Sequence, residues 1–227
     1  MNIIAANLLR VQIKINQACE RSGRLPSQVR LVAVSKTQPV ERLAEVVDEG
    51  HFLFGENRVQ EARDKIPLLA NPQARFHLIG PLQRNKVKEA LSLFQMIESL
   101  DSLEVAEEIE RRASQPMPVL VQVNVGREAQ KHGFLPEELP DTLRKLAQLS
   151  KIQVRGLMTV PPMVEEAEEA RPFFRQLAEL AARMNELAIP GVAMDELSMG
   201  MSHDFPVAVE EGATLVRVGS AIFGQRY

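Results

Sequence analysis

Cysteine is almost absent from this sequence, which has a single one, Cys19, among 227 residues. A lone cysteine excludes an internal disulfide and a cysteine-rich metal cluster, and it fits a reducing compartment. The four histidines show no metal-ligand spacing with acidic support, so we expect no metal site. The sequence also lacks the Gly-x-Ser-x-Gly nucleophile turn and a paired carboxylate signature. These absences argue against a hydrolase and against a metal-dependent enzyme.

Long apolar runs and an excess of one charge are missing as well. No segment approaches the roughly 18 consecutive apolar residues of a membrane span. Residues 1–15 carry Arg10 and Lys14 and have no small-residue cleavage site, so a signal peptide is not expected. The 27 basic and 30 acidic residues are interspersed and give a net charge of −3. We therefore expect a cytoplasmic protein whose partners include neither a membrane nor nucleic acid.

Strand-like and helix-like segments alternate along the chain after a first amphipathic helix. Apolar residues recur at three- and four-residue spacing over residues 3–21, which predicts that helix, and Gly23 and Pro26 end it. The expected strands are 31–36, 52–55, 76–80, 94–99, 119–125, 152–160, 196–200 and 214–219. The expected helices that follow them are 40–49, 59–69, 84–93, 103–113, 139–149, 165–187 and 205–211, and residues 221–223 could begin a last helical turn.

This alternation favours a parallel sheet with crossover helices. Eight such units in about 220 residues match the lower size range of a closed barrel. An open doubly wound sheet is the competing architecture. It usually carries a glycine-rich phosphate turn after its first strand, and Ser35-Lys36-Thr37-Gln38 is not one. We therefore expect an α/β fold, with one (β/α)8 TIM barrel domain over residues 1–227 and an additional N-terminal helix.

A lysine ends the first predicted strand. Because side chains alternate along a strand, Lys36 points to the same side as Val32 and Val34. If that side is the interior, the amine is partly desolvated and favours its neutral, nucleophilic form, which imine formation with an aldehyde cofactor requires. The alternative is an ordinary lysine whose head reaches water.

The other strand ends bear on this choice, because the carboxyl ends of all barrel strands surround one mouth, where the active site lies. Two stretches there resemble anion-binding turns. Ser198-Met199-Gly200-Met201-Ser202 places a glycine between two hydroxyls, and Arg217-Val218-Gly219-Ser220 precedes a helical turn with free amides. Each turn alone is weak evidence. The residues expected at the mouth are Lys36, Glu56, Asn57, His77 to Gly80, Asn124, Met158, Thr159, Ser198 to Ser202 and Arg217 to Ser220.

Arg217 needs a partner, because its neighbours in the strand are apolar and an unpaired buried guanidinium costs several kcal/mol. One alternative is a carboxylate near the adjoining strand end, Glu196 or Asp204. The other is an atom of a bound ligand.

Six motifs in order along nearly the whole chain resemble the pyridoxal phosphate homeostasis protein family, whose barrel is similar to the amino-terminal domain of alanine racemase. They are Val32-Ala33-Val34-Ser35-Lys36, Phe54 to Glu61, His77 to Lys86, Gly156-Leu157-Met158-Thr159, Leu197 to Ser202 and Arg217 to Gly224.

The resemblance implies a pyridoxal 5′-phosphate site and assigns a role to each matching residue. Lys36 would be the Schiff-base lysine, and Arg217 would face the pyridine nitrogen. A guanidinium donor there keeps that nitrogen unprotonated and weakens the ring as an electron sink. The remaining residues form two groups: Ser198, Gly200, Ser202, Gly219 and Ser220 around the phosphate, and Asn57, His77, Met158 and Thr159 along the cofactor.

Two functions are compatible with this resemblance. The first is a carrier and regulator without catalytic residues, which holds pyridoxal phosphate reversibly in the homeostasis of vitamin B6 and of amino and keto acids. Apo-enzymes that receive the cofactor would be its protein partners. The second is an amino-acid racemase that uses Lys36 as its base. Related racemases take a second acid-base group from a β-rich domain across a dimer. The sequence stops at Tyr227, after the eighth unit, so we expect no such domain, a monomer, and the first function.

Overall fold

Eight parallel strands close into a barrel in chain order, β1 to β8, in the computed structural model, which describes residues 2–224. The predicted barrel is confirmed. The closing pair is β1 with β8, where Val32 lies opposite Arg217. The strands are β1 (Arg30–Val34), β2 (Leu53–Glu56), β3 (Arg75–Leu78), β4 (Met96–Leu100), β5 (Met117–Gln122), β6 (Ile152–Met158), β7 (Val192–Ser198) and β8 (Leu215–Val218).

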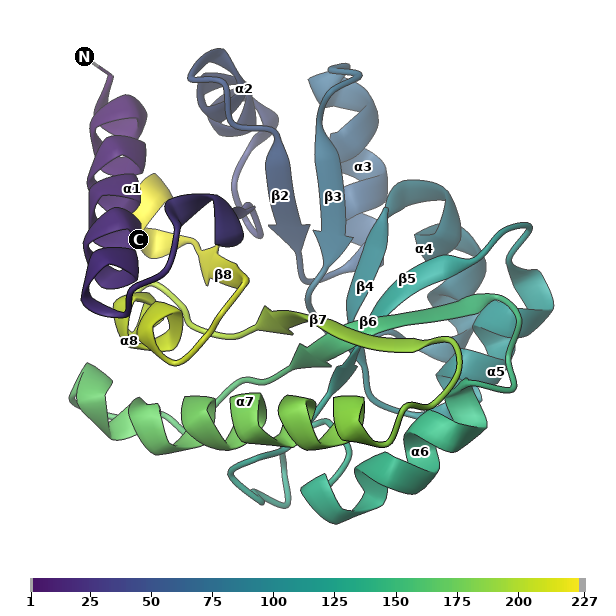
Figure 1. The fold of residues 1–227 in the computed structure, drawn as a ribbon. Helices are drawn as coiled ribbons and strands as arrows, with labels where there is room; N and C mark the ends of the chain where they lie inside the picture. The colour runs from purple at the N-terminus through teal and green to yellow at the C-terminus, as the bar shows by residue number, and fades with distance from the viewer. Residues whose placement is uncertain (1, 225–227) are drawn as a thin grey trace.

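Helices surround the barrel, and most follow the strands as predicted (Figure 1). They are α1 (Ile3–Arg21), α2 (Val40–Asp48), α3 (Val59–Leu69), α4 (Val87–Leu93), α5 (Leu103–Arg112), α6 (Leu139–Leu146), α7 (Arg171–Glu186), α8 (Phe205–Glu210) and α9 (Ser220–Phe223). Short 3₁₀ turns, η1 (Pro26–Gln28), η2 (Arg84–Lys86), η3 (Pro136–Glu138) and η4 (Ala167–Ala170), lie between them. None of the described helices is both long and apolar enough to cross a membrane.

Several predicted boundaries differ from the structure, among them those of β7, α7 and β1. Strand β7 begins at Val192, four residues earlier than the expected 196–200, and pairs with Val154 of β6. Helix α7 begins at Arg171 rather than at residue 165, because Pro172 occupies its first turn and lacks the N–H that a longer helix would need. Strand β1 ends at Val34, so Lys36 lies in the loop that follows it.

Helix α1 covers the side of the barrel where β8 closes on β1. Its apolar face, which includes Val11, Ile15 and Cys19, is buried, and the helix packs beside α8 and α9 (Figure 1). The Asn7 side-chain amide donates to the Ile222 carbonyl at 2.8 Å. The N-terminal helix therefore holds the last βα unit in place.

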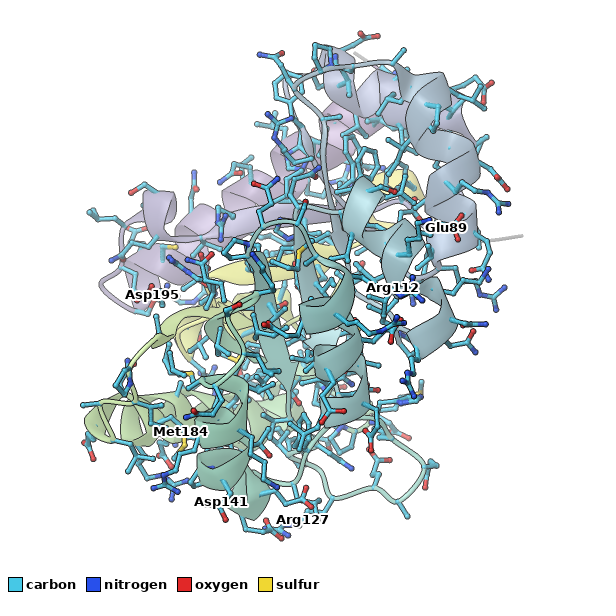
Figure 2. The ribbon with its side chains drawn as sticks, turned by 90° about the vertical axis from the view of Figure 1, so that its right-hand side faces the viewer. Glu89, Arg112, Arg127, Asp141, Met184 and Asp195 are labelled. Atoms are coloured by element: carbon cyan, nitrogen blue, oxygen red, sulfur yellow. The ribbon has the colours of Figure 1, made fainter. Side chains whose placement is uncertain are left out.

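Charged side chains lie on the outer faces of the surrounding helices. Figure 2 shows Glu89, Arg112 and Asp141 on α4, α5 and α6, directed away from the strands. Inside the barrel, a small apolar cluster fills the space between the strands; it consists of Val32, Met96, Leu120, Met158 and Leu215.

Candidate functional site

A cavity of about 640 Å³ lies at the carboxyl-terminal mouth of the barrel, and Lys36 lines it together with Val34. The alternation of β1 turns Val32 and Val34 to one side, and that side is the interior. Lys36 lies two residues beyond the end of that strand, in a turn where Thr37 adopts a left-handed φ of 63°. Six residues proposed for the site line the cavity: Lys36, Asn57, Ser202, Arg217, Gly219 and Ser220.

The two anion-suited turns meet at one wall of this cavity. The Ser202 hydroxyl oxygen accepts the Gly219 N–H at 3.1 Å and the Ala221 N–H at 3.3 Å. Two backbone donors therefore hold the Ser202 hydroxyl oxygen, and its hydroxyl hydrogen remains for an anion such as phosphate. Gly200 does not line the cavity. It has φ 90°, and a Cβ there would lie 2.5 Å from the Cβ of Ala208, so a glycine lets this turn pack on α8.

Arg217 is almost fully buried, and its partners are neutral oxygens. Its guanidinium donates to the Ser198 hydroxyl, and Nη2 donates to the Thr159 carbonyl at 2.7 Å. Glu196, one of the alternatives for this partner, does not contact Arg217 and pairs with Arg30 instead. Asp204 acts on Arg217 only through its charge: burial lowers the pKa of Arg217, and the charges of Glu98 and Asp204 oppose that shift.

A buried chain of side chains continues from Arg217 across the barrel interior. The Ser198 hydroxyl donates to Glu98 Oε2 at 2.6 Å, and Glu98 Oε1 lies 2.6 Å from His77 Nδ1. Glu98 is fully buried. Burial by itself would raise the pKa of this carboxyl, but the His77 hydrogen bond, the charges of His77 and Arg217 and the Ser198 hydroxyl bring it below the usual value. Glu98 is therefore an ionised group that balances Arg217, and sequence reasoning missed it.

Four of the proposed residues do not line the Lys36 cavity. Ser198 and Thr159 are buried under Arg217, and Met158 belongs to the apolar cluster inside the barrel. His77 lines a different cavity, of about 420 Å³, at the amino-terminal end of the barrel, with Arg30 and Leu53. Of these four residues, Ser198 and Thr159 bear on the Lys36 cavity, because they accept hydrogen bonds from Arg217.

Asn57 borders both the Lys36 cavity and a larger cleft of about 1010 Å³ over β2 to β5. Its Oδ1 atom is buried and has no hydrogen-bond partner among the described residues. A ligand that carries a donor could therefore bind to this acceptor. The larger cleft is lined by side chains such as Arg58, Lys86 and His132. It lacks the turns around Ser202 and Gly219, so we place the site in the smaller cavity. Within residues 2–224, no three His, Cys, Asp or Glu side chains gather in a way that could hold a metal ion.

The sequence matches the family model described as "Alanine racemase, N-terminal domain" over residues 7–227. A pyridoxal phosphate homeostasis protein of Aquifex aeolicus is 44% identical, and the match covers 96% of each chain. The protein of that name from Pseudomonas aeruginosa is 40% identical over 100% of this chain and 97% of its own. This chain belongs to the pyridoxal phosphate homeostasis protein family.

Solved structures agree with this family assignment. PipY of Synechococcus elongatus, solved with pyridoxal phosphate bound, is 37% identical, with a TM-score of 0.85 over 97% of this chain and 100% of its own. Alanine racemase from Corynebacterium glutamicum has a TM-score of 0.70 over 99% of this chain and 60% of its own, at 15% identity, and so shares the barrel fold.

Proposed function

We propose that this protein holds pyridoxal 5′-phosphate in the Lys36 cavity as a Schiff base, and that it serves the intracellular homeostasis of vitamin B6 and of amino and keto acids rather than a catalytic turnover. The observation that carries the proposal is that Lys36, Arg217 and the turn around Ser202 line one cavity. Its support from outside the chain is the family membership and the pyridoxal phosphate bound in PipY.

The cavity fits this cofactor in size and in chemistry. Its volume, about 640 Å³, lies within the range of small-molecule sites. The Ser202 hydroxyl would donate to the phosphate, and the Gly219 and Ala221 amides, which donate to its oxygen, would orient it. Arg217 would face the ring nitrogen, and the buried Asn57 Oδ1 would accept from a hydroxyl of the ligand.

The bound group supplies an aldehyde and an aromatic ring that can delocalise charge. Lys36 would supply the amine that condenses with that aldehyde, with the loss of one water. Ser198 and Thr159 fix Arg217, and Glu98 compensates its charge, so the donor above them stays charged and oriented. A guanidinium in this position would slow carbanion chemistry of the ring without abolishing it.

Absorbance spectroscopy tests the Schiff base. We expect wild-type protein with added pyridoxal phosphate to show a band near the visible edge, and Lys36→Ala to lack it. Lys86→Ala is the matched control, since Lys86 lines the neighbouring cleft at the same end of the barrel. A colourless wild type, or an unchanged band in Lys36→Ala, would contradict the proposal.

The racemase alternative is tested by exchange of the α-hydrogen of common L-amino acids in deuterated water. An ordinary enzyme would exchange at about 1 per second or faster. Besides Lys36, the cavity is lined by His203, whose ring Nε2 lies 3.0 Å from the Glu165 carbonyl oxygen. Exchange at an enzymatic rate that is lost in both Lys36→Ala and His203→Gln would establish a two-base racemase and overturn the carrier function.

A further inference from the structure

A buried ion cluster lies directly behind the loop that carries Lys36. We call it the Lys65 cluster, and it consists of Lys65, Glu56 and Glu61. The Lys65 ammonium donates to Glu56 Oε1 at 2.8 Å and to Glu61 Oε1 at 2.7 Å. The Lys65 side chain is 8% exposed and that of Glu56 is fully buried. All three residues belong to β2 and α3. Glu56 was expected at the barrel mouth, but it is buried against Lys65 and does not line the cavity, and the cofactor chemistry described above does not explain why a lysine is buried there.

The cluster holds the peptide bonds on both sides of Lys36. Lys65 Nζ also donates to the Ser35 carbonyl at 2.8 Å, which fixes the peptide plane before Lys36. The Thr37 N–H donates to Glu61 Oε1, which fixes the plane after it. Because the two planes set the φ and ψ of Lys36, they also set the direction of its Cα–Cβ bond. One ammonium thus joins both planes, through Ser35 directly and through Glu61.

Every polar atom of Ser35 makes a hydrogen bond. Its N–H donates to the Gly55 carbonyl at 3.0 Å, and its hydroxyl donates to Glu56 Oε1 at 2.7 Å. Thr37, on the other side, has a φ of 63°, which costs an L-residue about 1–2 kcal/mol. Such a conformation persists only where the surroundings over-determine it. The Lys65 cluster supplies that constraint.

A purely stabilising role explains the cluster less well. Buried ion pairs contribute little net stability, because the desolvation cost offsets their attraction. Here burial raises the pKa of Glu56 in spite of the opposing hydrogen bonds from Lys65 and Ser35. The cluster instead fixes the backbone geometry of Lys36, which lies between the Ser35 carbonyl and the Thr37 N–H that the cluster binds.

We propose that Lys65 and Glu61 are positioning residues for Lys36: they aim its amine into the cavity and so determine how readily it forms an imine, without touching the ligand themselves. This inference rests on the proposed function, because it assigns Lys36 the imine.

Two ligands separate positioning from binding. Pyridoxal 5′-phosphate can form an imine, whereas pyridoxine 5′-phosphate carries an alcohol in place of the aldehyde and can only bind. In Lys65→Met we expect the imine band to appear about 10²-fold more slowly, the cost of a misplacement near 1 Å. The affinity for pyridoxine phosphate, measured by calorimetry, should stay at the wild-type value. Glu61→Ala should show the same split, because it removes the acceptor of the Thr37 N–H.

A second ion cluster offers a matched control. Glu108 on α5 is 3% exposed and accepts from Arg111 and Arg112, the latter labelled on the outer side of α5 in Figure 2. Glu108→Ala should destabilise the protein and leave the imine rate unchanged, because none of these residues contacts the Lys36 loop.

The outcomes are distinguishable. Wild-type imine rates in both Lys65→Met and Glu61→Ala would overturn the inference, and so would an equal loss for both ligands, which would show a general structural role. If Lys65→Met does not fold, Glu61→Ala decides, since the Glu61 side chain is 25% exposed and its loss leaves the Lys65–Glu56 pair intact. If the wild type itself forms no imine band, the proposed function fails, which is a separate result.

Discussion

Replacing Glu98 by glutamine would remove the negative charge that balances Arg217 while keeping the size of the side chain. The amide oxygen can still accept from Ser198, and the amide nitrogen can donate to His77 Nδ1 in the other ring tautomer. The substitution therefore isolates the charge. Both charged groups are buried, Glu98 fully and Arg217 with 4% exposure.

Breaking a buried ion pair on one side costs about 3–5 kcal/mol, because a charge is left uncompensated. The charge of Asp204 still acts on Arg217, so we expect the low end, about 3 kcal/mol of unfolding free energy. For a chain of this size that corresponds to a fall in Tm of about 6–12 °C. Urea titration measures the free energy of unfolding. Circular dichroism is the signal to follow, because the chain has no tryptophan whose fluorescence could report unfolding.

The pH dependence gives an independent check on the same charge. The pKa of Glu98 in the folded protein lies below its usual 4.5. Its contribution to stability is therefore complete above pH 4.5 and is lost as the pH falls through the folded-state pKa. Wild type should lose stability more steeply than Glu98→Gln over that range.

Glu196→Gln is the matched control, because Glu196 is a strand glutamate whose partner, Arg30, has a 47% exposed side chain. Exposed pairs of this kind contribute about 0–1 kcal/mol. If Glu98→Gln falls within that same range, or if the two variants and the wild type share one acid profile, Glu98 does not balance Arg217 and the reasoning is refuted.

Two further substitutions test the backbone of the barrel and the phosphate turn. Gly156→Ala would place a Cβ 1.8 Å from the Glu196 carbonyl oxygen in the adjacent strand, and should cost about 3 kcal/mol in urea unfolding. Gly191→Ala is the control: Gly191 has φ 80° and open space around it, so this substitution should lower the unfolding free energy by only about 1 kcal/mol. An equal loss of unfolding free energy in the two variants would contradict the predicted clash at Gly156. Ser202→Ala should weaken pyridoxal phosphate binding about tenfold, through one lost hydrogen bond to a charged group. Pyridoxal, which has no phosphate, should bind as before in a spectroscopic titration, and a parallel loss for both would place Ser202 elsewhere.

Much of the fold was predictable because it depends on local patterns. The apolar runs and the helical periodicity between them indicate eight strand and helix units, and residues 59–69 form α3 with the predicted bounds. The same pattern put the end of β1 two residues too late, but Lys36 was still expected at the barrel mouth, where it lines the cavity. The later start of α7 and the earlier start of β7 were missed, because boundaries depend on pairing with neighbours.

The partners of the site residues were not predictable in this way. Sequence reasoning could state that Arg217 needs a partner, and only the structure shows that Ser198 and Thr159 provide it, while Glu196 binds Arg30. Lys65 gave no signal at all, because its contact with Ser35 joins residues 30 positions apart.

The sequence by itself thus determined which residues stand at the ends of the strands, since the direction of each side chain follows from the period of its own segment. The tertiary structure alone decided which of them meet. In a closed barrel the height of one strand against the next is set by the stagger of the whole sheet. That stagger brings Glu98 of β4 within reach of Ser198 of β7, and no local pattern in either strand records it.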